Sequence, residues 1–188
     1  MEFSKTEFPG LIIIQPRVFH DERGFFIESY QSELFAKNGI AHDFIQDNHA
    51  RSEDAGVLRG LHFQLPPFAQ GKLVWVTRGS VFDVAVDLRN GSPTFGKTFT
   101  TTLSADNFTR LFIPRGFAHG YMTLEVGTEF QYKVDAYYAP AHEAGIIWND
   151  PDLSIPWPEN VTPILSPKDQ NLPAFRDFSS PFVYASGN

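Results

Sequence analysis

Short runs of β-forming residues, separated by turn residues, follow one another along most of this chain. Examples are GLIIIQPRVF (10–19), KLVWVTRGSVFDVAVDLR (72–89) and TEFQYKVDAYY (128–138). The 14 Gly and 14 Pro are spread along the sequence and supply turns between the runs. One short helix is expected over SELFAKNGI (32–40), where Asn-Gly is a helix stop. Many short, regularly spaced strands predict an antiparallel barrel or jelly roll.

An acidic side chain stands among apolar residues in the second half of the run 72–89. Alternation places Asp83 on the same face as Val81 and Ala85. A carboxylate on an inward face suits a barrel whose interior is a polar cavity. Just before it, Arg78-Gly79-Ser80 predicts a hairpin that joins two strands.

Length, charge and cysteine content limit the classes of protein to consider. The 188 residues suffice for one domain with a sizeable core. A net charge of −7 disfavours nucleic-acid binding, so an anionic ligand would need a few well-placed cations. The chain has no Cys, no apolar signal core at its start and no run long enough to span a membrane. We therefore expect a soluble, cytoplasmic protein that binds neither membranes nor nucleic acid.

Two segments have the spacing of the metal-binding cupin motifs. They are GVLRGLHFQLPPFAQGKLVWVTRG (56–79) and PRGFAH (114–119). Gln64 stands where a metal site has a second His, and Lys72 stands where it has a carboxylate. An ammonium repels a cation, so we expect no metal here. The two motifs together predict a cupin-type double-stranded β-helix.

The residues left at these positions suit proton abstraction next to a carbonyl. His62 can accept a proton near neutral pH, and Lys72 can stabilise an oxyanion as a Lewis-acid metal would. Tyr132, on a later strand, is a candidate acid. Taken singly, each residue also has a structural reading: a buried His, a solvated Lys at a strand end and a core Tyr. Only their joint placement on the cupin scaffold favours catalysis.

Eight segments, three of which overlap the two cupin motifs, stand in order along nearly the whole chain: VFHDERGFFIESY, FIQDNHARS, GVLRGLHFQ, QGKLVWVTRGSVFDVAVDLR, SPTFGK, IPRGFAHGY, GIIWNDPDLSIPWP and LSPKDQNLP. Together they resemble the dTDP-4-dehydrorhamnose 3,5-epimerases. The resemblance implies an all-β, cupin-type jelly roll with a few short helices, a homodimer and no cofactor. It also implies epimerisation at C3 and C5 of dTDP-4-dehydro-6-deoxy-D-glucose to dTDP-4-dehydro-L-rhamnose, a step of dTDP-L-rhamnose biosynthesis.

The resemblance further implies roles for individual residues. His62 would be the base, oriented by Asp169, while Tyr132 would be the acid and Lys72 would face the 4-keto oxygen. The chain 1–188 would form a single epimerase domain, with a jelly-roll core over about 10–150 and an irregular segment 151–188 that contributes to the site. The implied substrate-binding residues are Arg23, Glu28, Gln46, Asp47, Asn48, Arg59, His119, Tyr138 (stacked on thymine), Glu143 and Lys168.

Three alternatives remain beside this interpretation. YMTLEVGTEF (121–130) and DAYYAPAHEAG (135–145) depart from the family pattern near the acid and the stacking Tyr, which leaves open a single-centre epimerase or ketoisomerase for another nucleotide sugar. A non-catalytic jelly roll that binds a sugar nucleotide would bind without proton exchange. A metal-dependent dioxygenase of the cupin type is opposed by Lys72.

Overall fold

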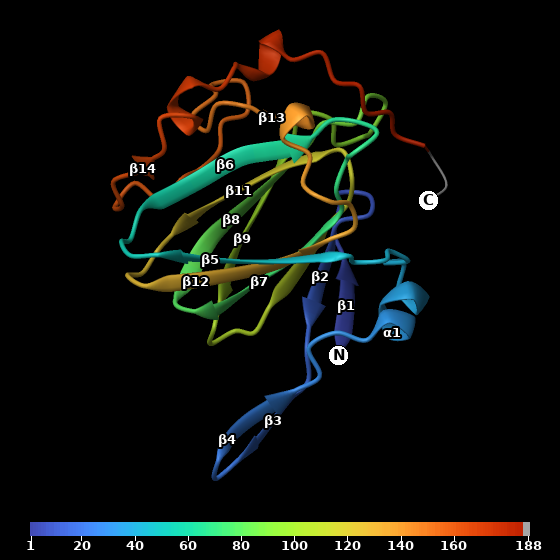
Figure 1. The fold of residues 1–188 in the computed structure, drawn as a ribbon, viewed down its shortest axis with the longest axis vertical. Helices are drawn as coiled ribbons and strands as arrows, with labels where there is room; N and C mark the ends of the chain where they lie inside the picture. The colour runs from blue at the N-terminus through green and yellow to red at the C-terminus, as the bar shows by residue number, and fades with distance from the viewer. Residues whose placement is uncertain (186–188) are drawn as a thin grey trace.

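Two β-sheets lie face to face in the computed structural model, which describes residues 1–185 (Figure 1). The first sheet has the order β1–β2–β10–β7–β12–β5, with bounds Glu2–Lys5, Ile12–Gln15, Arg110–Ile113, Lys72–Arg78, Thr128–Val134 and Gln46–Ser52. The second has the order β13–β6–β11–β8–β9, with bounds Glu143–Gly145, Val57–Gln64, Phe117–Thr123, Ser80–Asp87 and Thr98–Ser104. Strand β14 (Ile164–Leu165) pairs in parallel with β6.

The chain changes sheet at almost every connection between β6 and β13, with β8–β9 as the exception. This alternation is the topology of a double-stranded β-helix, so the predicted fold class is confirmed. The hairpin predicted at Arg78-Gly79-Ser80 is wrong, because β7 and β8 belong to different sheets. Gly79 instead forms the corner between them, with φ +72° and no room for a Cβ beside Thr128. A turn signal does not show which sheet the next strand joins.

The remaining elements lie outside the two sheets. Pro16 separates β2 from β3 (Val18–Asp21), which pairs with β4 (Gly24–Ile27) in a hairpin that projects from the body of the molecule (Figure 1). The predicted helix is α1 (Ser32–Lys37), which ends before Asn38-Gly39. Beyond β13, the described residues are irregular apart from β14 and two short 3-10 helices. The 3-10 helices are η1 (Pro140–His142), η2 (Asp169–Asn171) and η3 (Phe175–Asp177). The last residues of the predicted segment 151–188, namely 186–188, lie outside the described residues.

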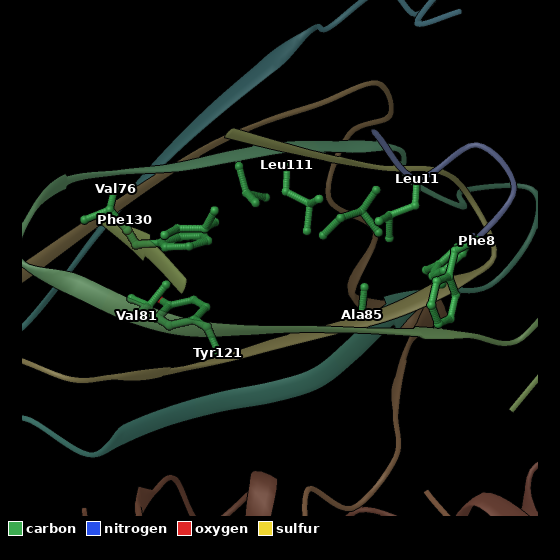
Figure 2. Packing of buried hydrophobic residues seen from close by; sticks show 12 residues of the cluster. Phe8, Leu11, Val76, Val81, Ala85, Leu111, Tyr121 and Phe130 are labelled. Atoms are coloured by element: carbon green, nitrogen blue, oxygen red, sulfur yellow. The ribbon is translucent and has the colours of Figure 1, made fainter. Parts of the chain in front are cut away.

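Apolar side chains fill much of the space between the two sheets (Figure 2). Leu111 and Val76 from the first sheet face Val81 and Ala85 from the second. The other face of the second sheet is also covered, because Phe82, Val84, Val86 and Leu88 pack against apolar residues of the C-terminal segment, including Trp157, Phe175, Phe178 and Phe182. Burial of both faces explains why β8 has apolar residues on both, with the buried acids Asp83 and Asp87 as the exceptions on the inner face. No helix among the described residues is long and apolar enough to cross a membrane.

Leu111→Ala should lower the free energy of unfolding by about 2–5 kcal/mol, because Leu111 is fully buried between the sheets and its removal leaves a cavity. Urea unfolding followed by circular dichroism would measure the change. Val126→Ala is the matched control, since Val126 is 71% exposed and its truncation should cost less than about 0.5 kcal/mol. Equal effects of the two substitutions would contradict this account of the core.

Candidate active site

An irregularity in the pairing of β6 with β11 brings two side chains of β6 to one cavity. His119 pairs with His62 and Tyr121 pairs with Arg59, so three steps on β6 oppose two on β11. Without this bulge, Arg59 and His62 would face opposite sides of the strand. Gly60 permits it, because a Cβ there would lie 2.6 Å from the Cα of Gly120.

The cavity lies between the two sheets and has a volume of about 460 Å³. The first sheet contributes residues of β5, β7 and β12, the second sheet contributes residues of β6 and β11, and the C-terminal segment closes one side. The cavity holds three cationic side chains in a protein whose net charge is −7, so it is suited to an anionic ligand. The polar lining residues are Arg59, His62, Lys72, His119, Tyr121, Tyr132, Ser166, Lys168 and Asp169.

His62 and Asp169 form the closest polar contact in this cavity. His62 Nε2 lies 2.5 Å from Asp169 Oδ1, and the carboxylate is almost fully buried at the start of η2. A carboxylate partner holds the proton on Nε2 and leaves Nδ1 with a free lone pair. Burial lowers the pKa of His62, and the charge of Asp169 opposes this effect. The imidazole is therefore a neutral, oriented base at neutral pH.

The ammonium of Lys72 lies deep in the cavity wall. Burial lowers its pKa to about 8, while the charges of Asp83 and Glu143 oppose the shift. Among the described residues Lys72 forms no salt bridge. A desolvated cation without a direct ion-pair partner interacts strongly with any negative charge that develops beside it.

A second His–Asp pair lies close enough to Lys72 for the charge of its carboxylate to act on the ammonium. His119 was predicted as a substrate-binding residue, but its pairing with Asp83 was not. His119 Nε2 lies 3.0 Å from Oδ2 of Asp83, which is completely buried on β8. The other oxygen, Oδ1, has no hydrogen-bond partner among the described residues. The sequence signal for Asp83 was its place between Val81 and Ala85 on one face of the strand. Beyond these pairs, no three His, Asp or Glu side chains of residues 1–185 come together as they would to hold a metal ion.

The two tyrosines of the cavity keep their protons at neutral pH. Burial raises the pKa of Tyr132 on β12, and the charge of Arg59 opposes this. Burial also raises the pKa of Tyr121 on β11, whose ring stacks on Phe130 at 4.0 Å between centroids. Tyr132, the predicted acid, thus lies in the cavity wall with its hydroxyl proton in place, and Tyr121, which was not predicted, lies beside it.

A smaller cavity of about 100 Å³ adjoins the first and shares His62, Lys72 and Tyr132 with it. Tyr138 and Glu143 also line it, and the Tyr138 hydroxyl donates to Glu143 Oε2 at 2.9 Å. Lys168 contacts the same carboxylate oxygen at 2.6 Å. The structure therefore brings Tyr138, Glu143 and Lys168 to one side of the site, as predicted.

Strand β5 presents the predicted residues 46–48 on opposite faces. The alternation of burial along β5 places Gln46 and Asn48 on the same face as the cavity-lining Ala50. Asp47 lies on the other face, where both carboxylate oxygens accept hydrogen bonds from Lys133 at 2.8 and 2.9 Å. The side chain of Asp47 therefore does not reach the cavity of this chain.

Arg23 and Glu28 are also outside both cavities. The Arg23 side chain is 90% exposed in the projecting hairpin and pairs with Asp21. Glu28 follows β4 and lines a separate surface cavity near Arg17. Within a single chain, neither side chain lines a cavity that contains His62.

Known proteins of one enzyme family are similar to this chain over nearly its whole length. Residues 5–177 match the family model described as dTDP-4-dehydrorhamnose 3,5-epimerase. The epimerase of that name from Pseudomonas aeruginosa is 52% identical over 94% of this chain and 97% of its own.

Two solved structures are similar over most of their length. One is dTDP-4-dehydrorhamnose 3,5-epimerase from Bacillus anthracis with TDP and PPi bound (48% identity, TM-score 0.89, 92% of this chain and 98% of that one). The other is dTDP-6-deoxy-D-glucose-3,5-epimerase from Legionella pneumophila in complex with dTDP-4-keto-L-rhamnose (44% identity, TM-score 0.93, 98% and 99%).

The depressed pKa of Lys72 predicts a pH-dependent difference in stability between wild type and Lys72→Met. The folded pKa of about 8 lies below the unfolded value, so the unfolded chain binds more protons between these two values. Wild type should therefore gain stability relative to Lys72→Met, by on the order of 2 kcal/mol, as the pH rises from about 8 to about 10.5.

Denaturant titrations at several pH values would measure this difference. Lys5→Met, a substitution on the exposed edge strand β1, is the control and should leave the difference constant across the same range. A flat difference for Lys72→Met as well would mean that its ammonium is solvated.

Proposed function

The chain belongs to the dTDP-4-dehydrorhamnose 3,5-epimerase family, and on that premise we propose that His62, Lys72 and Tyr132 carry out its chemistry. The enzyme is an isomerase that acts by proton abstraction next to a ketone. The substrate is dTDP-4-dehydro-6-deoxy-D-glucose, which is inverted at C3 and C5 to dTDP-4-dehydro-L-rhamnose. One observation carries the assignment: the hydrogen-bonded side chains of His62 and Asp169 line the same cationic cavity as the desolvated ammonium of Lys72.

His62 removes a proton from each carbon next to the ketone. The 4-keto group acidifies the protons at C3 and C5, because the carbanion is stabilised as an enolate. The Nδ1 lone pair of His62 accepts the proton, and Asp169 stabilises the imidazolium that forms. Both carbons flank the same ketone, so one base in one cavity serves both inversions.

Lys72 and Tyr132 complete the proton transfer. The ammonium of Lys72 interacts more strongly with the enolate oxygen than with the neutral ketone, which lowers the barrier rather than merely tightening binding. Tyr132, from the opposite sheet to His62, returns a proton from the other face of the sugar ring. Delivery to the face opposite to the one deprotonated is what inverts a stereocentre.

The two other cationic side chains of the cavity bind the diphosphate of the substrate. Arg59 and Lys168 line the same cavity, and a guanidinium can bind phosphate oxygens with two parallel hydrogen bonds. Tyr138, with 53% of its surface exposed at the adjoining cavity, offers a ring face on which thymine can stack.

We also propose that the enzyme acts in the cytoplasm. The chain has no Cys and so forms no disulfide, which fits a reducing compartment.

A homodimer would bring in the remaining predicted residues. The projecting hairpin exposes Phe25 and Phe26 by 59% and 68%, which is costly in a lone chain (Figure 1). Beside it, Arg110 is buried on the outer face of the first sheet with Nε and Nη1 unpaired among the described residues. A second copy packed on this face would cover the aromatic rings and carry its own Arg23 and Glu28 towards the first copy's cavity.

Deuterium exchange separates the base from the acid. In deuterated water, His62→Ala should lose exchange at both C3 and C5 by about 10²–10⁴-fold, since the substitution removes the proposed general base. Tyr132→Phe should keep exchange but lose net epimerised product, because the ring remains and its proton does not. Proton NMR of the sugar follows both signals at once.

His49→Ala is the matched control, because His49 lies on the exposed face of β5, and it should exchange at the wild-type rate. Wild-type exchange in His62→Ala would refute the assignment of the base. Loss of both exchange and product in Tyr132→Phe would instead place Tyr132 in binding or proton removal. Exchange at one carbon only in the wild type would identify a single-centre epimerase.

Mixing two inactive variants tests the contribution of the second copy. Arg23→Ala and His62→Ala subunits, unfolded and refolded together in equal amounts, should recover about one quarter of wild-type activity, because half of the dimers are mixed and each has one intact site. If Arg23 acts within its own chain, the mixture stays as inactive as its components. Light scattering after gel filtration would verify that the mixture is dimeric.

A further inference from the structure

Tyr138 lies in a segment of four residues whose backbone is hydrogen-bonded to the side chains of glutamines. The segment Ala136–Ala139 follows β12 and belongs to no strand or helix. Within residues 1–185, the backbone–backbone hydrogen bonds near it involve only Asp135 and Ala139, at its ends. Its inner amide and carbonyl groups therefore find their partners elsewhere.

Each residue of this segment bonds to a glutamine side chain through one backbone group. Gln64 makes two of the bonds: its Nε2 donates to the carbonyl of Tyr137 at 3.2 Å, and its Oε1 accepts from the amide of Ala139 at 2.7 Å. The other two bonds come from Gln70 Nε2 to the carbonyl of Ala136 (2.7 Å) and from the amide of Tyr138 to Gln46 Oε1 (3.1 Å).

Gln64 is the centre of this arrangement. Its side chain is almost fully buried at the end of β6, two residues after His62, and its Nε2 also donates to the carbonyl of Phe68 at 2.7 Å. The side-chain amide of Gln64 thus uses both N–H donors and its oxygen acceptor. Only Asn or Gln offers this combination of groups without burying a charge. Gln64 also pairs across β6 and β13 with Glu143, which accepts the Tyr138 hydroxyl.

We propose that Gln64 is a positioning residue for nucleotide binding: its amide orders the segment Ala136–Ala139 and so fixes the ring of Tyr138 at the mouth of the site. This inference rests on the proposed function for the role of Tyr138, but not for the ordering of the segment. Tyr138 is more than half exposed, and its hydroxyl bond to Glu143 anchors only the tip of the ring. The backbone position of Tyr138 must therefore come from the glutamine bonds. The residue that stands in place of a metal ligand in the cupin pattern thus has a different task here.

Gln64→Met keeps the length of the side chain and removes its hydrogen bonds. Amide hydrogen exchange of Tyr138 and Ala139, followed by mass spectrometry, should become faster by at least about tenfold. The KM for the nucleotide sugar should rise about tenfold while kcat stays within about threefold, because the base, the acid and Lys72 are untouched. Gln15→Met is the control. Gln15 lies on β2, next to the edge strand β1, and donates to the carbonyl of Asn107, so its substitution should change neither quantity.

A double-mutant cycle with Tyr138→Ala separates positioning from general stability. If Gln64 acts through the ring of Tyr138, Gln64→Met should change KM by less than about twofold once that ring is absent. An equal effect in both backgrounds, an unchanged KM, or unchanged amide exchange would each overturn the proposal. Should Gln64→Met not fold, Gln70→Met removes one bond of the same set and should show the same pattern with smaller effects.

Failure of the proposed function would look different. The wild type would then not turn over the nucleotide sugar, whereas amide exchange needs no substrate and would still report whether Gln64 orders the segment. Binding of dTDP alone, measured by calorimetry, would then decide the role of Gln64 in nucleotide recognition, with weaker binding by Gln64→Met expected and equal binding against it.

Discussion

The contact between His62 and Asp169 joins parts of the chain that are 107 residues apart. His62 lies on a strand of the second sheet, whereas Asp169 begins a short 3-10 helix in an otherwise irregular segment. That segment packs its aromatic residues on the outer face of the second sheet and closes one side of the cavity. The same contact therefore orients the proposed base and lies where the C-terminal segment closes one wall of the site.

The site works electrostatically against the charge of the whole protein. An acidic chain places Arg59, Lys72 and Lys168 around one cavity, so an anionic sugar nucleotide is attracted there and not to the rest of the surface. Burial keeps Lys72 poorly hydrated, and the nearby acids Asp83 and Glu143 favour its charged form. In the proposed mechanism, this fixed organic cation stands where the cupin motif has a metal ligand and stabilises the negative charge that develops on the substrate.

Two irregular features supply what regular strands could not. The bulge at Gly60 turns both Arg59 and His62 into the cavity, although strict alternation would separate them. The segment after β12 leaves the sheet, so that side-chain amides of glutamines, and not a neighbouring strand, hold its backbone. Binding residues on such segments are oriented by a rigid scaffold beneath them, which is a common division of labour in β-proteins.

Sequence alone predicted the strand-rich jelly roll and the altered cupin motif, because alternation, turn residues and motif spacing are local properties. The same motif spacing led us to propose the trio His62, Lys72 and Tyr132. The partnership with Asp169 came from family resemblance. Only the tertiary structure decided that Asp47 points outwards, that Asp83 supports His119, and that Gly79 is a corner between sheets and not a hairpin turn. Spacing along the chain reports which face a side chain occupies, but not which strand will become its neighbour. That choice depends on how all the apolar faces can be buried at once.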